Sequence, residues 1–359
     1  GEEQSGILRQ IVADRPSCTL SEITRELAAR TGIQAHEATV REALRAAGLR
    51  RVRGEAAVER RPRAPTGRYG YTQAHRRHDP DQRYPSCLTD AEWELVEDLF
   101  EPAGGRGVPP QYPRRALVDA CCYVARTGCA WRMLPRDFPP WGNVYKTFRR
   151  WTAQGKFERM HDRLRAQWRA REGHGAAPSE AVLDAQSTRS SPQGGPSGFD
   201  AGKKVKGRKR SLVVDTLGLL LAVSVTAANL QDRDAASDAV ADAAAKYPSV
   251  ATLFVDSAYA GQFAQTVEEN YAIRVEVVRH PANKTVGQWQ ADDAPERVPA
   301  KANADGFVPL PKRWIVERTH AWNERARRLI MHHDRLICVS EAWVWLAEAR
   351  ILLRRMTTS

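Results

Sequence analysis

The chain has 359 residues, and at roughly 100–200 residues per domain this length predicts two or three domains. With 42% apolar residues it can build ordinary cores, and its 55 Lys and Arg against 43 Asp and Glu leave a charge of +12 that favours a polyanionic partner. The six cysteines form no CxxC pair, which argues against a zinc ribbon or disulfide scaffold and favours the cytoplasm. No signal-peptide pattern or bilayer-length apolar run is visible, so we expect no membrane partner.

Residues 1–50 are predicted to form a helix-turn-helix DNA-binding domain. Apolar residues recur at helical spacing in three short runs, and Gly32 marks the turn before the third helix. A helix-turn-helix places its last helix in the major groove, although a plain three-helix bundle would show the same pattern. The expected DNA contacts on the exposed face of the third helix are Thr39, Arg41 and Arg45.

Residues 51–85 are rich in Arg and Pro and are predicted to form an extended arm or linker. The run Arg60-Arg61-Pro62-Arg63 is typical of arms that enter a narrow minor groove, where Arg61 and Arg63 would contact DNA. A solvated linker is the alternative interpretation.

Residues 86–175 are predicted to form a second, helical DNA-binding region. A capping box at Thr89 and Glu92 begins its first helix. In a later helix one face is apolar and belongs to the core, with Val144, Phe148 and Trp151. The opposite face is basic and suits DNA phosphates. It carries Lys146, Arg149 and Arg150.

From residue 176 to 359 the pattern changes to an α/β domain with a five-stranded mixed sheet. Strands are predicted at 181–184, 212–215, 219–225, 252–256 and 273–278, with helices at 232–246, at 258–270 and from about 314. A polar loop covers 280–312. We interpret Asp232 as a helix cap and Asp215 as a strand residue.

Three acids of this domain form the candidate catalytic and metal site. Asp184 and Asp256 each end a predicted strand, and acids at the ends of adjacent strands would repel each other unless a cation lay between them. Glu317, at the start of the last helical segment, is the third acid. Carboxylates are the ligands that Mg²⁺ prefers, and three of them around two ions suit phosphoryl transfer. Nearby basic residues fit a nucleic-acid substrate. They are Lys203, Lys204, Lys206, Arg208, Lys209, Arg210, Arg325, Arg327 and Arg328.

From about Ser86 onward the chain resembles bacterial insertion-sequence transposases of the group-five type. The matching segments are LTDAEWELVEDLF, TGCAWRMLP, WGNVYKTFRRW, VLDAQS, KGRKRSLVVDTLGLLLAVSVTAAN, LFVDSAYAG and RWIVERTHAWNERARRL. The resemblance implies an RNase H-like catalytic core with a DDE triad, carried here by Asp184, Asp256 and Glu317. It also implies two Mg²⁺ ions per site, with Mn²⁺ as a substitute.

The sister group-four family has a signature of Tyr, Arg, Glu and Lys at fixed spacing, and this chain keeps part of it. Arg313 and Glu317 retain their spacing, Leu310 stands where Tyr would be, and Glu324 stands where Lys would be. Arg325 follows Glu324 and can supply the missing positive charge. Around Glu317 we therefore expect Arg313, Arg318, Arg325 and Arg328 to contact DNA.

The sequence thus predicts a DNA transposase that binds terminal inverted repeats, exposes a 3′-OH by metal-dependent hydrolysis and joins it to target DNA. Asp184 would bridge both ions, while Asp256 and Glu317 each complete one. Double-stranded DNA is the expected partner, and paired ends imply a dimer or larger homo-oligomer. Two alternatives stay open. The chain could be a domesticated transposase acting as a sequence-specific regulator, or an RNase H-like nuclease or resolvase.

Overall fold

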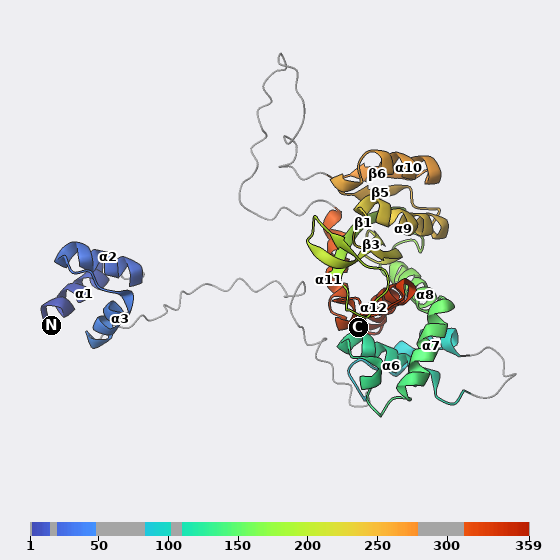
Figure 1. The fold of residues 1–359 in the computed structure, drawn as a ribbon, viewed down its shortest axis with the longest axis horizontal. Helices are drawn as coiled ribbons and strands as arrows, with labels where there is room; N and C mark the ends of the chain where they lie inside the picture. The colour runs from blue at the N-terminus through green and yellow to red at the C-terminus, as the bar shows by residue number, and fades with distance from the viewer. Residues whose placement is uncertain (1, 15–19, 48–82, 102–109, 279–311, 359) are drawn as a thin grey trace, which may run out of the picture. The chain divides into compact units, whose positions relative to one another are not determined.

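The computed structural model describes residues 2–14, 20–47, 83–101, 110–278 and 312–358, and these divide into two compact units (Figure 1). The first unit lies within residues 1–75 and the second within residues 76–359. The Arg- and Pro-rich segment, with Arg61 and Arg63, and most of the predicted 280–312 loop lie outside the described residues.

The first unit contains the three helices predicted from apolar spacing. They are α1 (Glu2–Asp14), α2 (Leu20–Thr31) and α3 (Glu37–Ala46). Their small core joins Leu8, Ile11, Ile23, Leu27 and Val40. Gly32 ends α2 with a left-handed φ of +69°, a conformation that glycine adopts without steric cost. This geometry explains why the chain reverses there before α3.

Helices also fill the first part of the second unit. They are α4 (Asp90–Glu94), α5 (Glu97–Phe100), α6 (Arg114–Thr127), η2 (Trp131–Met133), α7 (Trp141–Ala153) and α8 (Lys156–Arg171). The predicted capping box is confirmed, because the Thr89 hydroxyl accepts from the Glu92 backbone N–H and the Glu92 carboxylate accepts from the Thr89 N–H. The apolar face of α7 is buried as expected.

A mixed sheet of six strands follows, with the order β2-β3-β1-β5-β6 and with β4 paired to β3. Its strands are β1 (Glu180–Arg189), β2 (Gly198–Asp200), β3 (Val205–Asp215), β4 (Leu220–Ala227), β5 (Thr252–Val255) and β6 (Arg274–Val277). Strand β3 pairs antiparallel with β1, β2 and β4, whereas the β1–β5 and β5–β6 pairings are parallel. The mixed sheet is confirmed, but the prediction of five strands missed the three-residue β2.

The predicted strand at 212–215 also begins too late, which left Lys206, Arg208, Lys209 and Arg210 outside it, whereas Lys203 and Lys204 do lie between strands. Residues 205–210 belong to β3, and because this strand is paired on both sides it buries basic residues along with apolar ones. The lengths of β1 and β3 were underestimated for the same reason, since polar residues continue both strands beyond their apolar segments.

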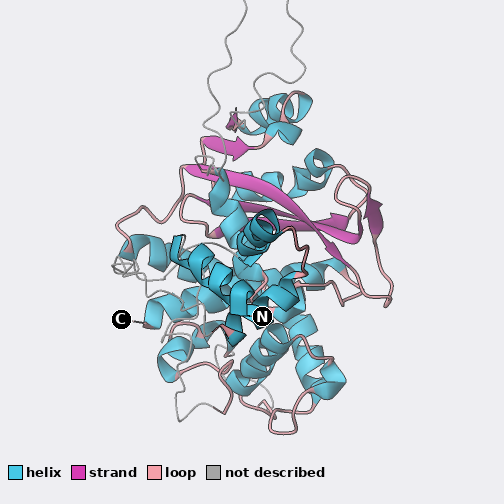
Figure 2. Ribbon diagram, turned by 90° about the vertical axis from the view of Figure 1, so that its left-hand side faces the viewer, coloured by secondary structure: helices cyan, strands magenta, loops and turns pink. Residues whose placement is uncertain are grey.

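Helices cover both faces of the sheet (Figure 2). On one face, α9 (Asp232–Lys246) and α10 (Gln262–Tyr271) pack on residues such as Leu183 and Val213. On the other face lie α11 (Arg313–Asn323) and α12 (Ile337–Thr357). The core of this second face continues without interruption into the preceding helices, because α12 contacts β4 as well as α6, α7 and α8.

Candidate active site

Asp184 and Asp256 are brought together by the parallel pairing of β1 with β5. This pairing runs from Glu180–Thr252 to Val182–Phe254, and each acid lies two residues beyond its last paired residue. The expectation that the two strands are neighbours is therefore confirmed. Asp184 does not end its strand, however, because β1 stays paired with β3 on its other side, where Asp184 faces Leu212.

Arg313 lies between the other two acids. Its Nη2 atom is 3.3 Å from Oε1 of Glu317, one turn along α11, and 4.0 Å from Oδ2 of Asp256. The Asp256 carboxylate also accepts a hydrogen bond of 2.8 Å from the Ala258 backbone N–H and so caps the short helix η3 (Ser257–Tyr259). One guanidinium thus partly neutralises two of the three predicted catalytic carboxylates.

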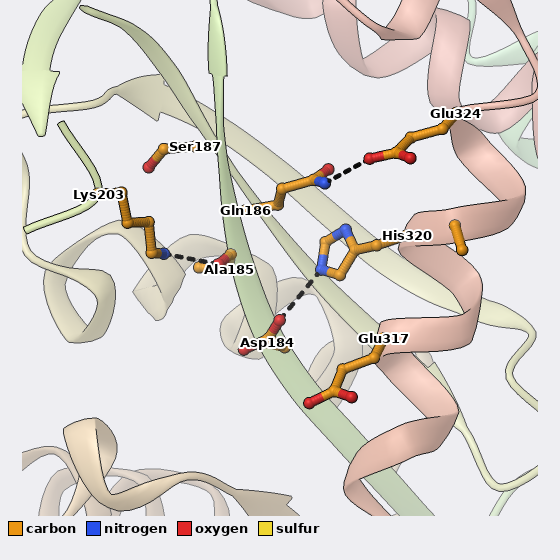
Figure 3. Close-up of a pocket in the computed structure, with 9 residues that line it drawn as sticks. Asp184, Ala185, Gln186, Ser187, Lys203, Glu317, His320 and Glu324 are labelled. Carbon is orange, nitrogen blue, oxygen red and sulfur yellow. Dashed lines mark hydrogen bonds and ion pairs between the residues drawn. The ribbon is translucent and has the colours of Figure 1, made fainter. Parts of the chain in front are cut away.

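Asp184 and Glu317 line one pocket, reached from β1 and from α11 respectively (Figure 3). Two side-chain contacts join the strand to the helix there. Nε2 of His320 lies 3.4 Å from Oδ2 of Asp184, and Nε2 of Gln186 donates to Oε1 of Glu324 at 3.0 Å. The pocket is completed by Ala185, Ser187, Lys203 and Ala321.

Sequence reasoning missed His320 and Gln186 as parts of this site. A signal was present, because His320 follows Glu317 by three residues and therefore shares its helical face. Gln186 likewise follows Asp184 by two residues and shares its strand face. The buried Tyr259 was missed as well. Burial, together with the charges of nearby acids including Asp184, raises the pKa of its phenol.

Lys203 borders the pocket from the opposite side of β1. Its Nζ donates to the Ala185 carbonyl at 2.8 Å and lies 3.1 Å from Oδ2 of Asp232. The prediction that Asp232 caps α9 was wrong, since Gln231 holds the cap position and makes no side-chain capping bond. Asp232 instead pairs with Lys203 and with the buried Lys209, whose Nζ is 2.5 Å away.

Most of the described residues that we predicted to contact DNA have side chains that reach solvent. Those that are exposed or half-buried are Thr39, Arg41, Arg45, Lys146, Arg149, Arg150, Lys203, Lys204, Lys206, Arg313 and Arg325. The predicted basic face of α7 therefore exists as a surface.

Two of the predicted DNA contacts are corrected by the structure, because their side chains are buried and engaged within the protein. Arg208 is 1% exposed and donates to the carbonyls of Pro196 and Arg335. Arg328 is 6% exposed and is paired with Asp334 at 2.7 Å. Arg318 is half-buried, and its contact with DNA stays a prediction. Its guanidinium lies over two indole rings and donates to a main-chain carbonyl. Those partners are Trp314, Trp322 and Leu217.

Asp215 is confirmed as a strand residue, and its buried carboxylate has other partners than a metal. Its Oδ2 accepts from Nη1 of Arg169 at 2.6 Å, while Oδ1 accepts from the backbone N–H groups of Leu217 and Leu219. These bonds fix the turn between β3 and β4.

The chemistry of Asp184, Asp256 and Glu317 fits divalent cations, since all three provide partly exposed carboxylate oxygens. Their present spacing does not form a finished site. Across the part of the chain that the structure describes, no three His, Cys, Asp or Glu side chains are close enough to hold one ion. Arg313 occupies the space between two of the acids, so the carboxylates must turn from the guanidinium to bind a metal.

Two family models match the second unit. The model described as "Putative transposase of IS4/5 family" matches residues 88–161, and the model described as "Transposase DDE domain" matches residues 175–352. Within the described residues, no helix combines the length and apolar character needed to cross a membrane.

Two curated proteins are similar to part of the chain. An uncharacterized 16.2 kDa protein of insertion element IS402 from Burkholderia cepacia is 33% identical over 89 residues, which cover 23% of this chain and 60% of that protein. The uncharacterized protein y4sN of Sinorhizobium fredii is 32% identical over 74 residues, covering 20% of this chain and 58% of that protein. The chain thus spans about three fifths of the length of each relative. Together with the two models, these matches show that the chain belongs to the IS4/5 family of transposases with a DDE domain, and hence has an RNase H-like core.

Proposed function

We propose that this chain is a DNA transposase that cuts the ends of an insertion sequence and joins the exposed 3′-OH to target DNA. The observation that carries this proposal is the register of β1 with β5, which gives Asp184 and Asp256 equivalent positions on neighbouring strands. Glu317 of α11 lines one pocket with Asp184 and shares the Arg313 guanidinium with Asp256. A regulator that only binds DNA has no need for carboxylates on two neighbouring strands and on the facing helix, because their like charges repel one another.

Asp184, Asp256 and Glu317 would hold two Mg²⁺ ions, or Mn²⁺ in their place. Divalent ions bound there supply the charge that stabilises the attacking and leaving oxygens of phosphoryl transfer. The chain's own cations complete the site. Lys203 borders the pocket, and its side chain is 39% exposed, so it is placed to bind a DNA phosphate. The Arg313 side chain would leave the two acids and bind the substrate instead.

DNA recognition would use the basic surfaces outside the pocket, with terminal inverted repeats and target DNA as the double-stranded partners. Helix α3 presents Thr39, Arg41 and Arg45 to solvent, as a recognition helix requires. The basic face of α7 would contact phosphates. Arg61 and Arg63, which lie outside the described residues, would add contacts to the minor groove.

Replacement of the three acids tests the function. Asp184→Asn, Asp256→Asn and Glu317→Gln should each lower Mg²⁺-dependent cleavage and joining by ~100-fold or more, because metal ligation requires the charge. Binding to end DNA without metal should stay close to that of the parent chain. Asp238→Asn on the exposed side of α9 is the matched control and should retain activity. A variant that still cleaves at the control rate would remove that residue from the triad.

The same substrates separate transposition from the two alternatives. A nuclease or resolvase would cut without joining the 3′-OH to a second duplex, whereas a domesticated regulator would bind ends and cut nothing. Cleavage followed by strand transfer into target DNA is the result that supports a transposase.

We also propose that a dimer or larger assembly forms on paired ends, in the cytoplasm and beside the nucleoid. A charge of +12 opposes association without DNA, and DNA removes that repulsion. Mixing a triad-inactive full-length chain with an active chain that cannot bind ends should restore cleavage if one subunit acts on the end bound by another. No restored cleavage, with one protein per cleaved end by mass photometry, would contradict the assembly.

A further inference from the structure

Helix α11 and strand β1 are connected by the two side-chain contacts in the pocket. His320 lies in the last turn of α11 and Glu324 is the residue that caps this helix. They contact Asp184 and Gln186, which are two residues apart on β1. The two contacts therefore lie in the same order along both elements. They fix the position of α11 along β1 (Figure 3). Because Glu317 lies one turn before His320 on the same helix, these contacts also fix the position of Glu317.

His320 differs from the other polar residues of this pocket because it is buried. Its side chain is 7% exposed, whereas that of Asp184 is 21% exposed. Both ring nitrogens are buried and, within the described residues, make no hydrogen bond of standard geometry. Nε2 has the Asp184 carboxylate at 3.4 Å. Since a buried imidazole N–H without an acceptor is costly, a small turn of Asp184 that completes a hydrogen bond to Nε2 is favourable.

We propose that His320 is a positioning residue that holds one carboxylate oxygen of Asp184 and thereby orients this acid for a divalent cation. The inference rests on the proposed function of the same site. A neighbouring residue that hydrogen-bonds to a metal-ligating carboxylate fixes the orientation of that carboxylate before the ion binds, and this raises the affinity for the ion. His320 touches neither DNA nor the reacting atoms in this role.

The alternative is that His320 only fills space beneath Asp184. Two substitutions separate these roles. His320→Leu keeps an apolar group of similar bulk and removes the donor, whereas His320→Gln keeps an N–H that can reach the carboxylate. A packing role predicts that Leu is tolerated at least as well as Gln, and a positioning role predicts the reverse.

The decisive measurement is a titration of the full-length chain with Mn²⁺ in the absence of DNA. The EPR signal of the free ion reports how much Mn²⁺ remains unbound. His320→Leu should weaken binding by about tenfold, while His320→Gln should stay near the parent value. At saturating Mn²⁺ the Leu variant should recover most of its end cleavage, because the contact acts on the metal requirement. Asp238→Asn serves as the neutral control, and Asp184→Asn marks complete loss of the ligand.

Parental affinity in His320→Leu, or equal losses in the Leu and Gln variants, would overturn the proposal. If the parent chain binds no Mn²⁺, the proposed function fails at its metal step, and melting temperatures then test the contact alone. If the melting-temperature changes caused by His320→Leu and Asp184→Asn do not add in the double variant, the two side chains interact directly, which supports the proposal. Additive shifts overturn it.

Discussion

Asp184 and Asp256 occupy equivalent positions on two neighbouring parallel strands, each two residues beyond the last paired residue. In this arrangement both carboxylates follow the point where the parallel pairing of β1 with β5 ends, the side of an open α/β sheet on which ligands bind. Their like charges require a counter-charge, and Arg313 provides one for Asp256 and Glu317. A protein cation and the proposed metal ions therefore compete for the same carboxylates.

Removal of Arg313 should separate metal binding from catalysis. We expect Arg313→Gln to tighten Mn²⁺ binding by a few fold, since a partly exposed ion pair of up to about 1 kcal/mol no longer has to be broken. End cleavage should fall, because the residue no longer reaches the substrate. Arg325→Gln, which removes the same charge from an exposed position, is the control for affinity. Weaker Mn²⁺ binding in Arg313→Gln would show that the guanidinium holds the acids in place.

Substitutions on α3 should change specificity. Arg41→Ala and Arg45→Ala should each reduce the preference for end DNA over random DNA by about 1–3 kcal/mol if they contact bases. Arg25→Ala removes the same charge from an exposed position on α2 and should weaken binding to both DNAs equally. Competition binding at fixed salt measures the ratio. An equal effect of all three variants would exclude α3 as the recognition helix.

The buried pair of Asp215 and Arg169 should contribute strongly to stability. Asp215→Ala leaves the Arg169 guanidinium, only 6% exposed, without its carboxylate and removes the acceptor of two backbone N–H groups. We expect a loss of about 3–5 kcal/mol in the free energy of unfolding. Urea titration followed by circular dichroism measures it. Asp238→Ala should change stability by less than about 0.5 kcal/mol.

Glu348 should make stability depend on pH. Burial raises its pKa from 4.5 to about 8, so in the folded chain it stays protonated where the unfolded chain is ionised. Unfolding then releases a proton between these values, and stability should fall as pH rises, by up to about 1.4 kcal/mol per pH unit. In Glu348→Gln the melting temperature should fall less steeply with rising pH between pH 5 and 8. The exposed Glu269→Gln should leave the slope unchanged.

Local patterns were enough to predict most of the elements and to show that the strands before Asp184 and Asp256 are neighbours. The apolar spacing of Val144, Phe148 and Trp151 gave α7, and the short apolar strands before Asp184 and Asp256 gave both acids with their neighbouring strands. These features depend on periodicity within a few residues, which a single sequence displays directly.

The fate of individual basic residues could not be predicted in the same way. Lys206 is exposed and Arg208 is buried, although they are two residues apart on β3. The difference comes from distant segments. Arg208 is satisfied by Arg335 and Ser340, more than a hundred residues away in sequence. The contact of His320 with Asp184 depends on distant segments as well. Helical spacing places His320 on the face of Glu317, but it does not show that this face packs on β1.

Helix α12 has a consequence for how the chain acquires its structure during synthesis. It follows all the elements it packs against, and Arg350 on α12 meets Glu92 at 2.9 Å across 258 residues of sequence. Trp343 stacks on Phe148 with ring centroids 4.2 Å apart. The helices around Phe148 therefore leave the ribosome long before their last packing partner. We expect the fragment 86–175, expressed alone, to expose this aromatic surface and to aggregate unless α12 is supplied.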